Sequence, residues 1–333
     1  MAGDLPTNLL STYDVGSFGW GVAASAQMHA EDYTDVLTIL DSTQTPFFSG
    51  APKIRVKDRV HSWPVDSLDA AASAGAAVGV DFGGDTFTTA VRLLNGTQIF
   101  RQDVVVDDGE RESNPIGITD YYDHQVMKKF KVLVRNFEFA SFRLITTASA
   151  SGLESSAVSN APRMAGIRGF GITTAGSTTA SFATADLVTL TQIMFNNGAE
   201  PDTIWFAPAT KIQFVNSTLG TSINVRNIAA TDQCLIANID VFETPLNQLL
   251  AVVTDRFIPM GSATANGGFS YLVGDRSMMK VGFFRPPQHK EMGKNGDHTR
   301  GLVLMEATIE ATHPSAWGMV TGVTGASALV GGP

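Results

Sequence analysis

The longest regular pattern of apolar residues in this chain lies between residues 120 and 145. Its members follow one another at steps of four, three, four, three and four. They are Val126, Phe130, Leu133, Phe137, Ala140 and Leu144. An α-helix brings residues at these steps onto one face, and Asp120 stands where a side chain commonly caps a helix. The pattern therefore predicts a long helix over 120–145 with one buried face.

Shorter helical patterns and strand-like runs make up much of the remaining chain. Apolar residues at helical spacing occur over 31–40, 184–197 and 209–219. Runs of β-branched and aromatic residues, which are typical of strands, are more numerous. They cover 53–65, 86–94, 97–106, 203–208, 234–243, 248–254, 270–284, 300–314 and 316–325. This mixture predicts an α+β protein.

Small residues and glycine fill the stretch between the first two strand-like runs, SLDAAASAGAAVGVDFGGD. With little there to form a core, the stretch is typical of the tip of a long two-stranded excursion that leaves the body and returns. Asn95-Gly96 follows the second run. This dipeptide favours a tight hairpin, but a kink in a continuous returning arm is equally allowed. We expect the kink.

Four cations alternate along the run 53–65. They are Lys53, Arg55, Lys57 and Arg59. Because the side chains of a strand alternate between its two faces, an extended chain would place all four on one side. The chain as a whole carries a formal net charge of −9. We interpret the row as a contact with a neighbouring copy of the chain. Two alternatives are cations that deter aggregation at a sheet edge and a contact with DNA.

An acidic cluster surrounds the end of the run 97–106. Its members are Asp103, Asp107, Asp108, Glu110 and Glu112. Solvation is the simplest interpretation, because DDGERES is prone to form a turn, and binding of a cation is another. A further use is electrostatic. The candidate counterparts of the four cations are Asp103, Asp107, Asp108 and Glu110.

The sequence carries no motif for catalysis or for a cofactor. It has no phosphate-binding loop with its lysine, no G-x-S-x-G and no H-E-x-x-H. The single cysteine, Cys234, excludes an intrachain disulfide and multi-cysteine zinc sites. His289 and His298 share the stretch HKEMGKNGDH, for which an exposed loop is the simpler interpretation and a metal site the alternative. We therefore predict no catalytic residue, no cofactor and no metal site.

Length and composition allow a sizeable core. The chain has 333 residues, of which 44% are hydrophobic and 17% charged. The segment MAGDLPTNLLSTYDV lacks a basic region followed by an apolar run, so we expect no signal peptide, and no apolar stretch is long enough to span a membrane. The acidic balance argues against a protein that coats itself with nucleic acid.

The order of several segments resembles a known family. These segments are TPFF, HSWPVDSL, RLLNGTQIFRQDVVVDD, KKFKVLVRNFEFASFRLI, RMAGIRGF and GLVLMEATIEATHPSAWGMV. In this order they resemble the major capsid proteins of tailed bacteriophages, over roughly residues 45–320. The resemblance implies the Hong Kong 97-type capsid fold, which is an α+β fold.

The same resemblance implies a division of the chain. Residues 1–49 are similar to an N-terminal arm and residues 50–108 to an extended two-stranded loop that reaches over the adjacent subunit. Residues 109–160 and 285–333 are similar to the peripheral domain, which contains the long spine helix. Residues 161–284 are similar to the axial domain.

The implied function is a shell of hexamers and pentamers that forms an icosahedral head around double-stranded DNA, without sequence-specific contact. Portal, scaffolding or decoration proteins are the implied partners, and the virion, assembled in the bacterial cytoplasm, is the implied location. An encapsulin-like cargo shell on the same fold is one alternative. An enzyme, such as a hydrolase with a dispersed site, is another.

Overall fold

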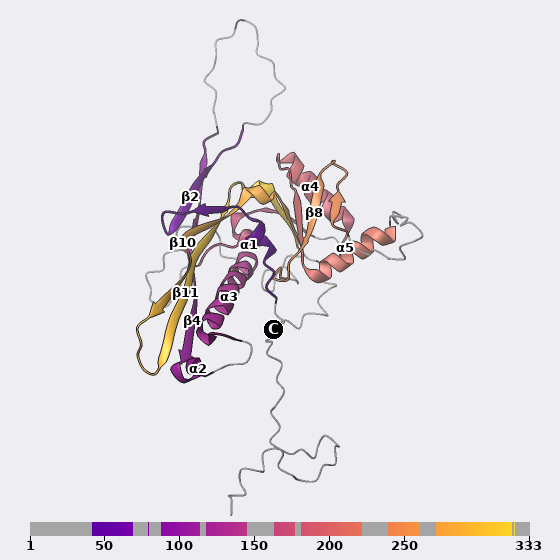
Figure 1. Ribbon diagram of the computed structural model, residues 1–333. Coiled ribbons are helices and arrows are strands. Elements are labelled where there is room, and N and C mark those ends of the chain that lie inside the picture. Colours follow the sequence, from indigo (N-terminus) through magenta and orange to yellow (C-terminus); the bar gives the residue numbers. More distant parts are fainter. Residues whose placement is uncertain are drawn as a thin grey trace, which may run out of the picture.

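The computed structural model describes residues 42–68, 79, 88–113, 118–144, 163–176, 181–221, 239–259, 271–321 and 323. The predicted helix over 31–40, most of the tip of the excursion and Cys234 lie outside these residues. The described part contains sheets of four and six strands, a two-stranded ribbon and helices packed on the sheets (Figure 1). None of its helices is long and apolar enough to cross a membrane.

The four-stranded sheet has the strand order β1-β10-β11-β4. Its strands are β1 (Lys53–Arg55), β10 (Met279–Met292), β11 (His298–Ala311) and β4 (Gln98–Asp107). β10 and β11 form a long antiparallel hairpin, β4 pairs antiparallel with β11, and β1 runs parallel to β10. The stretch HKEMGKNGDH is therefore not a loop throughout, as the sequence interpretation had it. His289 lies in β10 and His298 in β11, because β10 pairs with β11 as far as Met292, and β11 begins at His298, which pairs with Asp107 of β4.

Helix α3 (Tyr121–Arg143) lies along one face of this sheet (Figure 1). Its apolar face joins a buried cluster with alternate residues of β4 and β11. The strand members are Phe100, Val104, Val106, Val303, Met305, Ala307, Ile309 and Ala311. The Asp120 side chain caps the helix by accepting hydrogen bonds from the backbone N–H groups of Tyr122 and Asp123. The predicted long helix and its cap are thus confirmed.

The six-stranded sheet has the order β5-β12-β9-β6-β8-β7. Its strands are β5 (Thr173–Gly176), β12 (Trp317–Thr321), β9 (Tyr271–Gly274), β6 (Thr203–Phe206), β8 (Leu249–Thr254) and β7 (Val241–Glu243). Trp205 and Trp317 point to one face, where they stack at 4.9 Å between ring centroids and join the cluster around α3. Phe206 and Tyr271 point to the other face, toward α4 (Thr184–Asn196) and α5 (Pro208–Thr221). Both faces of this sheet are therefore covered.

The two-stranded ribbon consists of β2 (Val60–Val65) and β3 (Val91–Gly96), paired antiparallel. The single strand predicted over 53–65 is wrong, because the chain changes partner between Arg55 and Val60. The Val56 backbone N–H still donates to Phe283 of β10, whereas the Arg59 carbonyl accepts from Thr97. Val56 is buried at this change of direction. The predicted kink at Asn95-Gly96 is confirmed, since β3 ends there and β4 enters the four-stranded sheet.

Two short helices complete the part of the fold that concerns function. Helix α1 (Pro46–Gly50) packs against α3, and α2 (Asp108–Glu112) follows β4. Strand β12 lies in the six-stranded sheet although it belongs to the C-terminal segment, beyond β10 and β11. The chain therefore crosses from one sheet to the other between Ala311 and Trp317.

Candidate functional site

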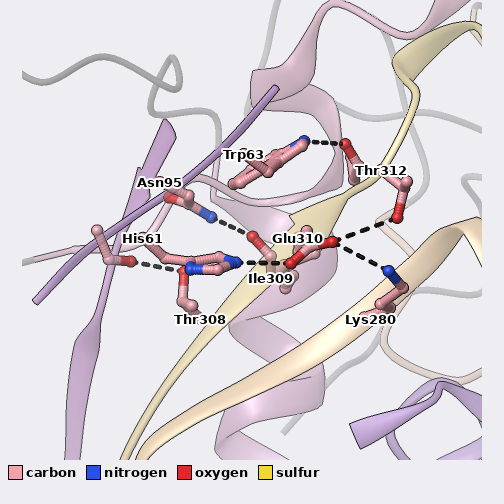
Figure 2. A network of polar contacts seen from close by, with 10 residues as sticks. His61, Trp63, Asn95, Lys280, Thr308, Ile309, Glu310 and Thr312 are labelled. Carbon is pink, nitrogen blue, oxygen red and sulfur yellow. Dashed lines mark hydrogen bonds and ion pairs between the residues drawn. The ribbon is translucent and has the colours of Figure 1, made fainter. Parts of the chain in front are cut away.

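The foot of the ribbon, residues 60–63 and 94–97, is fixed to strand β11 by polar contacts (Figure 2). The Trp63 indole N–H donates to the carbonyl of Ala311 at 2.9 Å, and the Thr308 hydroxyl donates to the carbonyl of Gly96 at 2.8 Å. The Trp63 ring also stacks on His61, with centroids 5.4 Å apart. The ribbon is thus held at one end, and its other end leads away from the sheet (Figure 1).

Asn95 joins three segments at the foot. Its side-chain oxygen accepts from the backbone N–H of Ala165 at 2.8 Å. Its side-chain nitrogen donates to the carbonyl of Ile309 at 2.8 Å and to that of Ala165 at 3.3 Å. Asn95 is fully buried, so water cannot replace these partners. One amide therefore ties β3 to β11 and to the segment before η4 (Ile167–Phe170).

Strand β11 presents polar residues to the foot and apolar residues to α3. Glu306, Thr308 and Glu310 alternate along the strand and are all buried, so they share the face that the ribbon covers. Glu306 Oε2 accepts from the Arg285 guanidinium at 2.7 Å, and its Oε1 accepts from the Thr97 hydroxyl at 2.7 Å. A buried carboxylate is tolerated when a cation and hydrogen bonds compensate its lost hydration. Both conditions are met at Glu306.

Glu310 makes the second charged contact of the foot (Figure 2). Its carboxylate lies 2.6 Å from His61 Nε2 and 3.1 Å from Lys280 Nζ. The hydrogen bond with His61 is the main cause that lowers the pKa of Glu310, and the bond from Lys280 adds to it, against the opposing effect of burial. Glu310 therefore stays ionised and links the ribbon, through His61, to β10, through Lys280.

The lowered pKa of Glu310 predicts an acid-sensitive foot. A carboxyl group whose pKa is lower in the folded than in the unfolded chain adds stability above its usual pKa of 4.5, and this stability is lost as the pH falls through the folded value. We expect the free energy of unfolding to fall below about pH 4.5 less steeply in Glu310→Gln than in the wild type. Chemical denaturation at several pH values measures this slope, with the exposed Glu112→Gln as control. Equal slopes in the Glu310→Gln and wild-type proteins would contradict the assignment.

The four predicted cations are separated by the break between β1 and β2. Lys53 turns back onto α1, where its ammonium group donates to the carbonyls of Phe48, Ser49 and Ala51 and lies over the Phe48 ring. Burial lowers the pKa of Lys53. Arg55, Lys57 and Arg59 are exposed. The row is thus not one face of one strand, and Lys53 is engaged within its own chain.

The predicted acidic residues lie at the far edge of the same sheet. Asp103 forms an exposed ion pair with Arg101 at 3.5 Å. Asp108 accepts from Lys294 and from the Thr299 hydroxyl, and these bonds lower its pKa. Asp107 and Glu110 are exposed at the end of β4 and in α2.

The two charged groups cannot meet within one subunit. Strands β10 and β11 separate Arg55 in β1 from β4. Arg59, whose carbonyl accepts from the Thr97 N–H, lies beside the start of β4, roughly 20 Å along that strand from Asp103. Arg55 lies opposite Phe283, which lies opposite Ala307, whereas Asp107 lies opposite His298 near the other end of β11. These positions on β11 are roughly 30 Å apart in an extended strand. We call the exposed cations Arg55, Lys57 and Arg59 the basic corner. The carboxylates Asp103, Asp107, Asp108 and Glu110 are the acidic corner.

Comparison with known proteins identifies the fold that carries these features. The family model of the SU10 major capsid protein matches residues 10–324. The chain belongs to this family. The capsid protein described here therefore has the Hong Kong 97-type, α+β fold that the sequence order implied, and it is a structural protein of the phage head shell. A search of curated protein sequences gave no match.

Solved phage capsids share the fold of this capsid protein at low sequence identity. The cyanophage A-1(L) capsid subunit is 12% identical, with a TM-score of 0.69, over 90% of this chain and 98% of that one. The capsid of cyanophage P-SCSP1u is 13% identical, with a TM-score of 0.58, over 88% and 93% of the two chains. The capsid of a native GTA particle is 12% identical, with a TM-score of 0.58, over 88% and 95%.

The foot of the capsid protein's ribbon was missed by sequence reasoning. Asn95 was considered as part of a turn-forming dipeptide, and no role was predicted for Trp63 or Glu306. A signal does exist in β11, where Glu306, Thr308 and Glu310 alternate with apolar residues. This alternation normally indicates a face open to water. Only the ribbon packed on that face shows that these residues are buried.

Proposed function

We propose that this capsid protein assembles with copies of itself into hexamers and pentamers of an icosahedral head, and that it has no enzymatic activity. The observation that carries this proposal is the ribbon, which is held at its foot and extends away from the sheets (Figure 1). Beyond the foot, Val91 and Leu68 are 62% and 98% exposed. A two-stranded ribbon is at best marginally stable in water. A neighbouring subunit in a shell supplies the surface on which such a ribbon can pack.

We propose the following division of the chain for this assembly. Residues 1–49 form the N-terminal arm, 50–108 the extended loop, 109–160 and 285–333 the peripheral domain, and 161–284 the axial domain. Support comes from the two sheets, since β10, β11 and α3 pack together while β6, β8 and β9 form the other sheet. β4 and β12 depart from a strict division, because each pairs outside its own segment.

The two charged corners are our proposed contacts between neighbouring subunits. Their separation within one chain leaves the exposed cations without these carboxylates as partners, and copies repeated around an axis can bring opposite corners together. Each exposed ion pair contributes only about 0–1 kcal/mol. Repetition of the pair in every subunit of a shell makes the sum significant for register and for the choice of partner.

Charge reversal tests this contact. We expect Arg55→Glu/Lys57→Glu to fold like the wild type but to form few or no shells, because like charges would then face each other. Light scattering with negative-stain microscopy measures assembly. The control is Lys128→Glu/Lys131→Glu, which reverses two exposed cations on α3. Adding Asp103→Lys/Asp107→Lys to the first variant should restore shells. Normal particles from Arg55→Glu/Lys57→Glu would reject the corners as a contact.

The remaining proposal concerns content and partners. We propose that the shell encloses double-stranded DNA without sequence-specific contact, works with portal, scaffolding or decoration proteins, and is assembled in the bacterial cytoplasm before it becomes part of the virion. The net charge of −9 supports this proposal, since a strongly cationic lining would retain DNA that must later leave. Purified particles should contain nuclease-protected DNA. Particles filled with enzyme cargo would instead favour an encapsulin-like compartment.

A further inference from the structure

A buried carboxyl group on α3 holds the start of helix α1. Glu138 accepts hydrogen bonds from the backbone N–H groups of Phe47 and Phe48, each at 2.7 Å, one on each carboxyl oxygen. Glu138 is fully buried. The same junction contains the Phe47–Phe142 and Phe48–Phe137 ring contacts, each with centroids 5.5 Å apart. The carboxyl group therefore occupies an apolar junction between α1 and α3.

A second carboxyl group reaches this junction from the six-stranded sheet. Asp255 directly follows β8, and its backbone N–H donates to the carbonyl of Phe206 in β6 at 2.9 Å. Its Oδ1 accepts from the backbone N–H of Phe257 at 2.8 Å. Its Oδ2 is buried and has no hydrogen-bond partner among the residues that the structure describes. A proton between Asp255 and Glu138 would supply the missing hydrogen bond.

Burial and the proximity of the two acids both favour this proton. Burial is the main cause that raises the pKa of Glu138 to about 9, and interaction with the Asp255 carboxyl adds to it. Burial also raises the pKa of Asp255. Two carboxyl groups that share one site cannot both ionise without strong repulsion. The two groups therefore titrate as a pair.

The cations around this junction are engaged elsewhere. Lys53 interacts with the charge of Glu138, but its ammonium group donates to three carbonyls at the end of α1. Arg143, one turn further along α3, lies over the Phe139 ring and donates to the carbonyl of Phe257 at 3.4 Å. Neither cation forms an ion pair with Glu138 or Asp255 in the described part of the chain. Arg276, whose side chain packs on Gly50 of α1, donates to the Thr203 hydroxyl at 3.3 Å. With these three cations engaged elsewhere, a proton is the remaining way to neutralise the pair.

We propose that Glu138 and Asp255 share one proton and form a pH-sensitive joint between α1, α3 and the six-stranded sheet. While the proton is present, one carboxyl group donates to the other and the joint is closed. When alkaline solution removes it, two adjacent buried carboxylates repel each other and α1 loosens. The joint lies within one subunit, so its test does not depend on the assembly proposed above.

Hydrogen exchange at the Phe47 and Phe48 amides tests the joint in the full-length protein. Opening releases the shared proton at pH values between the ordinary carboxyl pKa of the opened state and the raised pKa of the closed joint, and over this range it becomes about tenfold more favourable per pH unit. We expect the protection of these amides, corrected for intrinsic exchange, to fall by that factor per unit between about pH 4.5 and about pH 9, and to level off at higher pH. In Asp255→Asn the amide can donate to Glu138 without a titrating proton. The protection of the Phe47 and Phe48 amides in this variant should therefore not change over the same pH range.

Two further measurements keep the test decisive. Asp275→Asn is the matched control, because Asp275 caps its own turn through the Ser277 N–H at 2.8 Å, just as Asp255 does through Phe257. Its pH profile should follow that of the wild type. Infrared spectroscopy should detect a protonated carboxyl group near neutral pH in the wild type, and this band should be missing in Asp255→Asn. Identical exchange profiles in the wild type and Asp255→Asn, or no protonated carboxyl band, would overturn the proposal.

Discussion

Replacing Asn95 with alanine is expected to lower the free energy of unfolding by about 3–5 kcal/mol, because it removes the side-chain partner of three buried backbone groups, and an unsatisfied buried group costs about 1–3 kcal/mol. These groups are the N–H and the carbonyl of Ala165 and the carbonyl of Ile309. Denaturant unfolding followed by circular dichroism measures the loss. Because Asn95 fixes the foot of the ribbon, we also expect fewer complete shells from this variant.

Two further variants separate lost hydrogen bonds from lost volume at this position. Asn95→Asp keeps the shape and can still accept from Ala165, but it would face two carbonyl oxygens with a carboxylate. It should be about as destabilising as alanine near neutral pH and recover in part in acid, where a protonated carboxyl can donate. Asn196→Ala, at the exposed end of α4, should change stability by no more than about 0.5 kcal/mol. Stability of Asn95→Ala within that limit would refute the role of the amide.

Trp63→Ala should destabilise the subunit by about 3–5 kcal/mol, the range for removal of a buried tryptophan from a packed core. Trp63 is only 6% exposed and packs between His61 and Phe170, with ring centroids 5.4 Å and 5.9 Å away. Its loss would open a cavity beneath the ribbon and remove the hydrogen bond to Ala311. The ribbon should then become more accessible to limited proteolysis than the sheets.

Comparing Trp63→Phe with Trp63→Ala separates the contribution of the hydrogen bond to stability from that of ring packing. Trp63→Phe retains most of the ring but leaves the Ala311 carbonyl without the indole N–H, so a loss of about 1–3 kcal/mol is expected. Ser62→Ala alters the neighbouring residue on the exposed face of the same strand and should have little effect. If Trp63→Ala were no more destabilising than Ser62→Ala, the ribbon would not depend on this anchor.

Helices and strands could be predicted from the sequence where the local pattern of apolar residues matches the residues that the structure buries. The apolar residues of helix α3 and its Asp120 cap follow one another within a short stretch of sequence. The strands β4, β6, β8, β9 and β11 have the composition expected of buried strands. The kink at Asn95-Gly96 was also predictable, because a long excursion needs a returning strand. These features depend on residues close together in the sequence.

The break between β1 and β2 was not predictable in this way. Residues 53–65 read as one extended run, yet the first part pairs with β10 and the second with β3. Each pairing depends on segments far along the chain. The same is true of β12, which crosses into the six-stranded sheet. Strand partners are chosen by long-range packing, and the local sequence carries little information about that choice.

By itself, the sequence determined the α+β class, the long helix, the two-stranded excursion and, through the order of its segments, the capsid family. Only the tertiary structure decided which polar residues are buried. Glu138 and Asp255 look like ordinary charged residues until α1, α3 and β8 bring them into one apolar junction. A carboxyl group is costly in such a place unless a proton or a partner neutralises it, and that cost arises only when distant segments pack together.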